Sequence, residues 1–413
     1  MDMVNVIVIV KRAAAAALFF AATHAFADET KAPSIRPEIG KPVQAALDAL
    51  KAKKGKDALA RLHETDAVGG KTPYETYLIE RVKGQAAGMA GEPAVAAAAF
   101  EAAVASSAIP AADKAPLLAA AAGQYYTAKN YAKAGDACAR YFQEGGSDPA
   151  IRTLQTQALY LGGDLAKAAH ELQAEVKAAE AAGKVPAEQQ LQMLADIANR
   201  QKDSASAINV MEKLVTHYPK KDYWASLVYS VSTRSGLSTQ LSLDVLRLKM
   251  ATGTMRTVDE YVEAAQLAIQ AGFPAEAKKF IDAGYDAKLM GNGAGPDIER
   301  HKRLRDTAAK GLAEDTKSLG LDDAKVAAAA NGDPLMNTGL NYVLRGQADK
   351  GLPMMEQALK KGGFKRAEDA KLHLGFAQWL AGQKSKAIET LRTVKGTDGT
   401  AEIARLWVLV AQR

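Results

Sequence analysis

Residues 372–394 read LHLGFAQWLAGQKSKAIETLRTV, a stretch that predicts two short helices joined by a tight turn. Gly382 separates the two runs, at a place where a residue without a β-carbon adopts positive φ at little cost. Apolar residues recur at helical spacing on both sides of this glycine. The small residues Gly375 and Ala387 would let the two helices approach closely, while larger side chains fill the space around them. One such hairpin cannot bury its apolar faces alone, so we expect neighbouring copies of it.

Copies of this hairpin recur along the chain, and a small residue marks the point where the second helix of each would cross the first. The marker residues are Ala58, Ala96, Ala134, Ala168, Ala207, Ala277, Gly351 and Ala387. Their separations are 38, 38, 34, 39, 70, 74 and 36 residues. The two long separations each span two periods, with degenerate copies at 223–250 and 297–331. Ten units that repeat every 34 to 39 residues indicate a helical solenoid.

The hairpins resemble the tetratricopeptide repeat (TPR) family, whose pattern W-x2-L-G-x2-Y, then A-x3-F, then P recurs over about 34 residues. The three best matches carry Leu374, Gly375, Ala387 and Leu391; Gly339, Tyr342, Gly346, Gly351 and Met355; and Ala195, Ala198, Ala207, Met211, Leu214 and Pro219. The first tryptophan is missing from most copies, and closing prolines are sparse. The resemblance covers residues 42–400.

This resemblance implies an all-α fold, a right-handed superhelical solenoid of about ten TPR-like helix–turn–helix repeats. In such an array each repeat touches only its neighbours. The first helices would line a concave groove in which extended peptides or helices of other proteins lie. Seven residues are predicted to face this groove and bind a partner: Gln124, Tyr126, Gln157, Asn199, Gln266, Asn341 and Gln378.

The N-terminus predicts an export signal. A basic pair at 11–12 precedes an apolar run at 13–22, and residues 25–27 (AFA) supply the small-x-small cleavage pattern. We expect cleavage before Asp28 and a periplasmic protein. The apolar residues 4–10 leave two alternatives open, a start downstream of the first methionine or an uncleaved anchor. No later run approaches the length needed to span a bilayer.

The chain is expected to comprise four segments. These are a signal peptide at 1–27, a linker at 28–41, an N-terminal TPR-like array at 42–285 and a C-terminal array at 286–413. The division after residue 285 rests on the glycine-rich stretch that follows, since glycines weaken a helix.

Charge patterning disfavours nucleic-acid binding. Lys and Arg number 53 against 47 Asp and Glu, and the basic residues are spread along the chain rather than clustered. The densest basic stretch, residues 300–305, has acidic flanks and predicts a solvated helix face of mixed charge. An anionic partner or a membrane headgroup is the alternative for this stretch.

No motif predicts catalysis, a metal or a cofactor. No two histidines stand three or four residues apart, as a helical zinc pair requires, and no Gly-x-Ser-x-Gly elbow occurs. The glycine-rich stretch at 291–296 lacks the preceding strand and the Gly-Lys-Ser/Thr of a phosphate loop. Cys138, the only cysteine, aligns with Phe100 and Leu172 of neighbouring copies, so we expect a buried core residue and no disulfide.

These features favour a non-catalytic protein-interaction scaffold of the cell envelope. Its partner would be another envelope protein or a peptide segment held in the groove. The alternative is an adaptor in polysaccharide export or cell-wall assembly, whose partner would include a glycan. An envelope hydrolase is disfavoured because the repeats leave no room for a separate catalytic domain.

Overall fold

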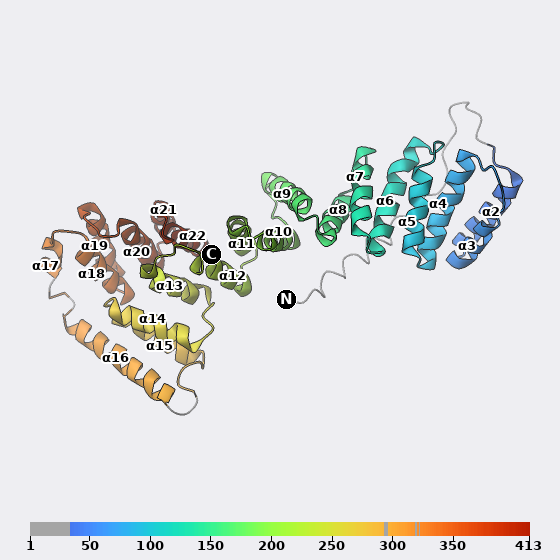
Figure 1. Ribbon diagram of the computed structural model, residues 1–413. Helices are drawn as coiled ribbons and strands as arrows, with labels where there is room; N and C mark the ends of the chain where they lie inside the picture. Colours follow the sequence, from blue (N-terminus) through green and yellow to red (C-terminus); the bar gives the residue numbers. More distant parts are fainter. Residues whose placement is uncertain (1–33, 293–295, 319, 322) are drawn as a thin grey trace. The chain divides into compact units, whose positions relative to one another are not determined.

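The computed structural model describes residues 34–292, 296–318, 320–321 and 323–413, and these residues are mostly helical (Figure 1). No β-strand occurs among them, which confirms the all-α prediction. The expected signal segment at 1–27 lies outside the described residues. The chain divides into two compact units, one that runs to Ala182 and one that begins at Gly183.

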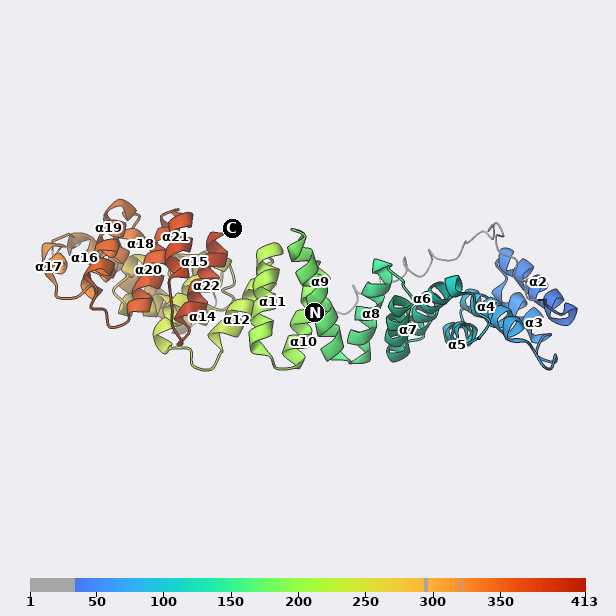
Figure 2. The same cartoon turned by 90° about the horizontal axis from the view of Figure 1, so that it is seen from above.

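The described part of the first unit consists of four consecutive helical hairpins (Figure 2). Their bounds are α2 Pro37–Lys51 with α3 Gly55–His63, α4 Pro73–Ala90 with α5 Pro93–Val104, α6 Ala111–Thr127 with α7 Tyr131–Gln143, and α8 Pro149–Gly162 with α9 Leu165–Ala181. Neighbouring hairpins also pack on each other, as α3 does on α4 and α5 on α6. Their shared core is rich in alanine, which permits close helix packing.

The second unit contains five further hairpins in its described residues. They are α10 Glu188–Arg200 with α11 Ser204–His217, α12 Lys221–Ser232 with α13 Ser242–Thr252, α14 Val258–Gln270 with α15 Pro274–Asp286, α18 Asp333–Leu344 with α19 Ala348–Lys361, and α20 Ala367–Leu380 with α21 Lys384–Arg392. A single helix, α22 Thr400–Ala411, follows them. The prediction of about ten TPR-like repeats is therefore confirmed, with one copy that departs from the pattern.

The departing copy is the degenerate one predicted at 297–331. It forms one long helix, α16 Pro296–Ser318, and one short helix, α17 Asp323–Ala328, which packs on α18. The sequence of α16 is largely charged, and His301 and Ala308 are its two buried residues. With so little apolar surface, α16 cannot serve as the first helix of a packed hairpin, and it lies along α14 and α15 instead.

The small residue expected at each helix crossing is buried in all eight marked copies. Ala58, Ala96, Ala134, Ala168, Ala277 and Ala387 are fully buried, and Ala207 and Gly351 nearly so. In the hairpin at 372–394, a β-carbon added to Gly375 would lie 2.5 Å from Leu391 Cγ. Gly382 takes up the turn with φ of +76°. These contacts confirm the repeat register.

The first helix begins earlier than the predicted linker at 28–41 allows. Helix α2 starts at Pro37, where a proline fits because the first turn lacks a hydrogen-bond acceptor for its nitrogen. Just before it, Arg36 binds Glu75 at the start of α4 through Nη2 to Oε2 (2.7 Å) and Nε to Oε1 (2.9 Å). The linker prediction is wrong here because this long-range ion pair holds the segment against α4.

The carboxylate of Glu75 should make the first unit acid-sensitive. Its side chain is fully buried, and hydrogen bonds from Arg36 and from the Thr72 backbone lower its pKa to about 2, below the ordinary 4.5. A lowered pKa contributes stability that is present above pH 4.5 and lost as the pH falls toward 2. We expect Glu75→Gln to destabilise the chain at pH 7, and the difference from wild type to shrink across this window.

Urea titrations followed by far-UV circular dichroism at several pH values measure this difference. The control is Glu64→Gln, whose exposed pair with Arg61 contributes little. A gap between wild type and Glu75→Gln that stays constant from pH 5 to about pH 2 would contradict the assignment.

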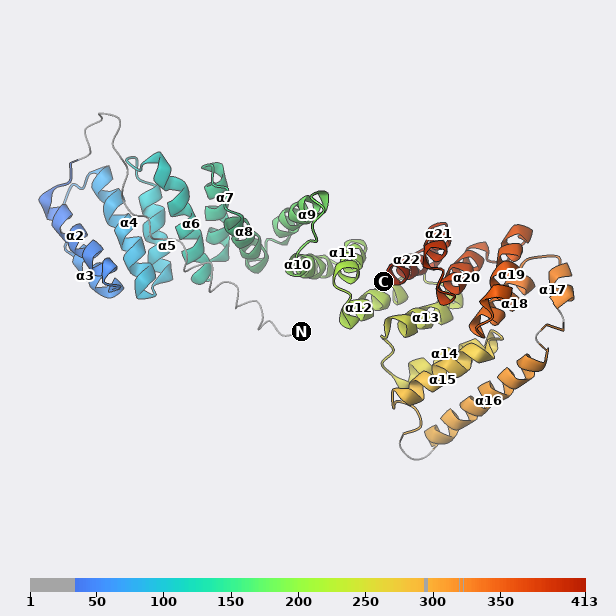
Figure 3. The ribbon, with the colours of Figure 1, turned by 180° about the vertical axis from the view of Figure 1, so that it is seen from behind.

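The second unit is not an open array, because its last helix packs on its early ones. Helix α22 contacts α11, α12 and α13 as well as α20 and α21 (Figure 3). Arg405 of α22 pairs with Glu212 of α11, and Arg234 after α12 pairs with Glu402 of α22. The expectation that each repeat touches only its neighbours is wrong for this unit.

The predicted division after residue 285 falls inside the second unit. Helix α16, which follows the glycine-rich stretch, packs on both α14 and α15, so these three helices belong to one compact unit. Gly284 lies in this packed region, where an added β-carbon would come within 2.6 Å of the Met290 sulfur. Glycine here permits a close approach rather than a domain boundary.

Candidate functional site

A buried cluster of charged side chains joins three helices of the second unit. Arg247 of α13 donates to Glu276 of α15 through Nε to Oε1 (2.8 Å) and Nη2 to Oε2 (2.7 Å). Its Nη1 donates to Asp244 Oδ1, one turn earlier on α13, at 2.9 Å. His373 of α20 approaches the same Asp244 carboxylate with Nε2 at 3.3 Å. The cluster therefore links repeats that are far apart in sequence.

The groups of this cluster stabilise one another's charges. Burial alone would raise the pKa of Asp244, but His373 and Arg247 lower it to about 2. Burial alone would lower the pKa of Arg247, but the carboxylates of Glu276 and Asp244 raise it above its ordinary value. The guanidinium also lies 4.9 Å from the centre of the Phe376 ring. Arg247, Asp244 and Glu276 thus hold the helices of the second unit together.

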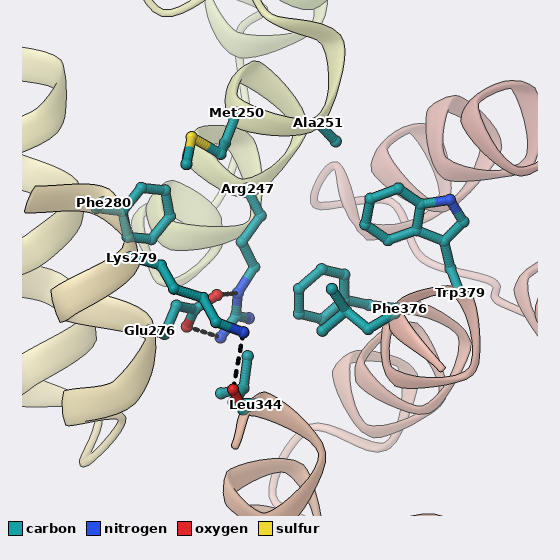
Figure 4. A pocket seen from close by; sticks show the side chains of 10 residues that line it. Arg247, Met250, Ala251, Glu276, Lys279, Phe280, Leu344, Phe376 and Trp379 are labelled. Carbon is teal, nitrogen blue, oxygen red and sulfur yellow. Dashed lines mark hydrogen bonds and ion pairs between the residues drawn. The ribbon is translucent and has the colours of Figure 1, made fainter. Parts of the chain in front are cut away.

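A cavity of about 140 Å³ lies beside this cluster (Figure 4). Its buried floor consists of Arg247 and Glu276 of the cluster together with Phe280 of α15, Leu344 of α18 and Phe376 of α20. Almost all of its surface is apolar. Four helices supply this floor, and ion pairs join three of them, α13, α15 and α20, which favours a preformed cavity.

The rim of the cavity is partly open. Met250 and Ala251 of α13 and Trp379 of α20 are half-buried, and Leu380 is 38% exposed. Lys279 of α15 is exposed, and its Nζ donates to the Leu344 carbonyl oxygen at 2.8 Å. An apolar cavity with one cation at its rim suits an apolar group that enters from outside.

Three predicted groove residues lie on first helices of the first unit. Gln124 and Tyr126 of α6 are half-buried, and Gln157 of α8 is 9% exposed. The Tyr126 hydroxyl donates to Gln157 Oε1 at 3.4 Å, so the structure brings these two together. Gln124 reaches back toward Gly88 of α4. Partner binding by these residues stays a prediction.

The other four predicted groove residues do not gather at one surface. Asn199 of α10 and Gln266 of α14 are exposed. Asn341 of α18 and Gln378 of α20 are buried, and Asn341 Nδ2 donates to Asp315 Oδ1 of α16 at 3.0 Å. The expectation that Asn341 and Gln378 present exposed side chains is corrected, because both are buried; partner binding by Asn199 and Gln266 stays a prediction.

The basic stretch at 300–305 lies on α16, where Arg300, Lys302 and Arg303 are exposed. Arg305 stacks over the Tyr285 ring at 5.1 Å. A solvated face of mixed charge agrees with this placement. Within the described residues, no three His, Cys, Asp or Glu side chains are grouped so as to hold a metal ion.

Cys138 is a core residue, as expected. It is fully buried on α7, like its repeat equivalents Phe100 and Leu172, and burial raises the pKa of its thiol to about 12. We therefore expect a thiol reagent at pH 8 to label the folded chain at least about 100-fold more slowly than the unfolded chain. Mass spectrometry of timed samples measures both rates, and rapid labelling of the folded chain would show that α7 is not packed as described.

The cavity and its charged cluster cannot be recognised in the sequence, because their members lie on helices far apart in the chain, from Asp244 to Leu380. One local signal was present. Asp244 and Arg247 stand three residues apart in α13, on a helix whose neighbouring positions Leu243, Leu246 and Leu248 are all apolar. A pair of charges in such a setting indicates buried partners elsewhere in the chain.

Comparison with known proteins adds one finding. A solved structure of yeast Tom70 is similar to this chain, with 12% sequence identity and a TM-score of 0.25. The match covers 91% of this chain and 95% of that one. No family model and no curated protein matches the chain. At such a score the match adds nothing to the fold that the helices themselves establish.

No helix in the described ranges is both long and apolar enough to cross a membrane. The longest, α16, is rich in charged residues.

Proposed function

We propose that the chain is a non-catalytic protein-interaction scaffold of the cell envelope that binds a segment of another protein. The supporting observation is the surface of successive first helices in the first unit. These helices keep apolar side chains only partly covered: Tyr74 and Leu78 on α4, Ala120 and Tyr126 on α6, and Ile151 and Leu154 on α8. Stacked repeats commonly use such a surface to bind extended partners.

The proposed partner is another envelope protein or a peptide segment of it. Polar groups near the apolar ones would orient this segment: Gln124 and Tyr126 are half-buried on α6, and the Tyr126 hydroxyl donates to Gln157 of α8. Few polar contacts within an apolar surface give orientation, while burial of apolar area supplies most of the affinity.

In-cell photocrosslinking tests this proposal. A photoreactive phenylalanine analogue at Tyr126 of the full-length chain should capture one defined protein in the source cells. The matched control places the analogue at Lys167, an exposed residue on the second helix α9, and should capture none. Capture of the same proteins at both positions, or of glycan alone, would overturn the proposal, and glycan alone would favour the polysaccharide adaptor.

Export to the periplasm is part of the proposal and rests on the residue pattern at 11–27. N-terminal sequencing of the chain isolated from a periplasmic extract should begin at Asp28. Recovery of the chain with an intact Met1 from the cytoplasm would contradict export.

A further inference from the structure

We propose that the cavity of the second unit receives one aromatic side chain of a bound protein segment, with an acidic group beside it that meets Lys279. This inference rests on the proposed scaffold function and specifies the partner's chemistry at a second place on the chain. Five observations carry it: the size of the cavity, its walls, its opening, its rim charge and its fixed frame.

The size of the cavity selects a single ring. Its volume of about 140 Å³ is close to that of an engineered apolar cavity of about 150 Å³ that binds benzene. Sites for drug-sized ligands span about 300–1,000 Å³, so a larger molecule would not fit inside. A phenyl group on a flexible stem, as in a phenylalanine side chain, matches this space.

The walls of the cavity favour an aromatic guest over an aliphatic one. Phe280 of α15 lies on one side of it, and Phe376 and Trp379 of α20 lie on the other (Figure 4). A ring between them would find edge and face partners at favourable separations. Met250 offers a polarisable sulfur of the kind that contacts ring edges. The guanidinium of Arg247 lies 4.9 Å from the Phe376 ring and 5.6 Å from the Phe273 ring, and so helps to hold Phe376 in the wall of the cavity.

The opening is apolar and reachable from solvent. Leu380 is among the few large apolar side chains of the described residues that are more than a third exposed. It lines the cavity next to the half-buried Trp379. Exposed apolar surface continuous with an apolar cavity indicates a binding site, because a guest removes both from water.

The rim charge specifies an acidic neighbour for the ring. Lys279 uses one of its three N–H groups on the Leu344 carbonyl and makes no ion pair with a described residue. The preceding residue on the helix, Lys278, is already paired with Asp282 at 2.5 Å. Arg247 is likewise saturated by Glu276 and Asp244. Lys279 is therefore the rim cation left to meet a carboxylate.

The frame of the cavity is rigid without a guest. The Arg247–Glu276 pair fixes α13 to α15, and His373 ties α20 to Asp244. Binding would then require little reordering of the protein, which preserves affinity for a small group.

The test uses 3-phenylpropionate, a surrogate for the ring and its acidic neighbour, with the full-length chain. The indole N–H signal of Trp379 in NMR spectra, assigned with Trp379→Phe, should shift and saturate below about 10 mM. The neutral 3-phenylpropanamide should bind about two- to fivefold more weakly. Ala251→Phe, which fills the cavity, should abolish both shifts while leaving the thermal midpoint within a few degrees of wild type.

Two matched variants isolate the contribution of Lys279 to binding of the acid. Lys279→Gln should make the acid and the amide bind equally, and Lys278→Gln should leave their difference unchanged. An unshifted Trp379 signal at about 10 mM, or an equal shift in Ala251→Phe, would overturn the proposal.

A second experiment identifies the protein that supplies the aromatic side chain. A photoreactive residue at Met250 on the rim should capture a protein in cells, and 3-phenylpropionate should reduce that capture in extracts. Binding of 3-phenylpropionate without capture of a protein at Met250 would overturn the proposal that a protein side chain occupies the cavity. Capture at Tyr126 without fragment binding would reject the cavity proposal alone and leave the scaffold function standing.

Discussion

Arg247→Met is expected to lower the unfolding free energy of the second unit by about 3–5 kcal/mol. The guanidinium side chain is 2% exposed and neutralises two carboxylates, Asp244 and Glu276, which are almost as buried. Methionine preserves the apolar stem but leaves Glu276 without its cation and Asp244 with His373 alone. An uncompensated buried charge is far more costly than a missing surface pair, because water cannot replace the lost partner.

Tryptophan fluorescence during urea unfolding measures this loss of stability in the second unit. All three tryptophans, Trp224, Trp379 and Trp407, belong to the second unit. The control is Arg256→Met, which removes an exposed pair with Asp222 and should change the free energy by less than about 1 kcal/mol. Equal midpoints for Arg247→Met and Arg256→Met would show that the cluster does not hold the second unit together.

The repeats could be predicted from sequence because their information is local. A small residue at each crossing and apolar residues at helical spacing lie within one hairpin, so Ala96 or Ala387 can be assigned without knowing the rest of the chain. The same holds for Cys138, whose burial follows from its repeat position. These residues are buried where the pattern places them.

The closure of the second unit could not be predicted, because it depends on pairs far apart in sequence. Asp244 and His373 are 129 residues apart, and Glu212 and Arg405 are 193 apart. In sequence, Glu212, His373 and Arg405 are single polar residues on helices, the ordinary mark of a solvated face, and the Asp244–Arg247 pair does not say which residues elsewhere it meets. The energetic reason for pairing them appears only when packing brings the helices together.

The same long-range packing explains why the groove prediction fails at Asn341. A polar residue on a first helix normally faces solvent, and its position in the repeat supports that interpretation. Here α16, from the copy with the least repeat character, lies close enough for Asp315 to accept from the Asn341 amide. A degenerate repeat thus removes a neighbouring residue from the available surface.

Gly351→Ala is expected to destabilise the second unit by about 1–3 kcal/mol, although alanine is the better helix former. Gly351 of α19 is where the second helix crosses the first in its hairpin. An added β-carbon would lie 2.4 Å from the carbonyl oxygen of Gly339 and 3.0 Å from the Val343 nitrogen, both in α18. These are backbone atoms, so no side-chain rotation relieves the clash, and α18 and α19 must move apart.

A glycine-to-alanine substitution on an open helix surface should instead stabilise the chain. Gly123, inside α6, has no atom within 4 Å of an added β-carbon. Gly123→Ala should therefore stabilise the chain by about 0.5–1 kcal/mol, since glycine loses more backbone entropy on folding. Urea unfolding followed by far-UV circular dichroism covers both variants, and tryptophan fluorescence isolates the second unit. If both Gly351→Ala and Gly123→Ala stabilise the chain, close contact does not require a small residue where the two helices cross. The repeat register would then lose its basis.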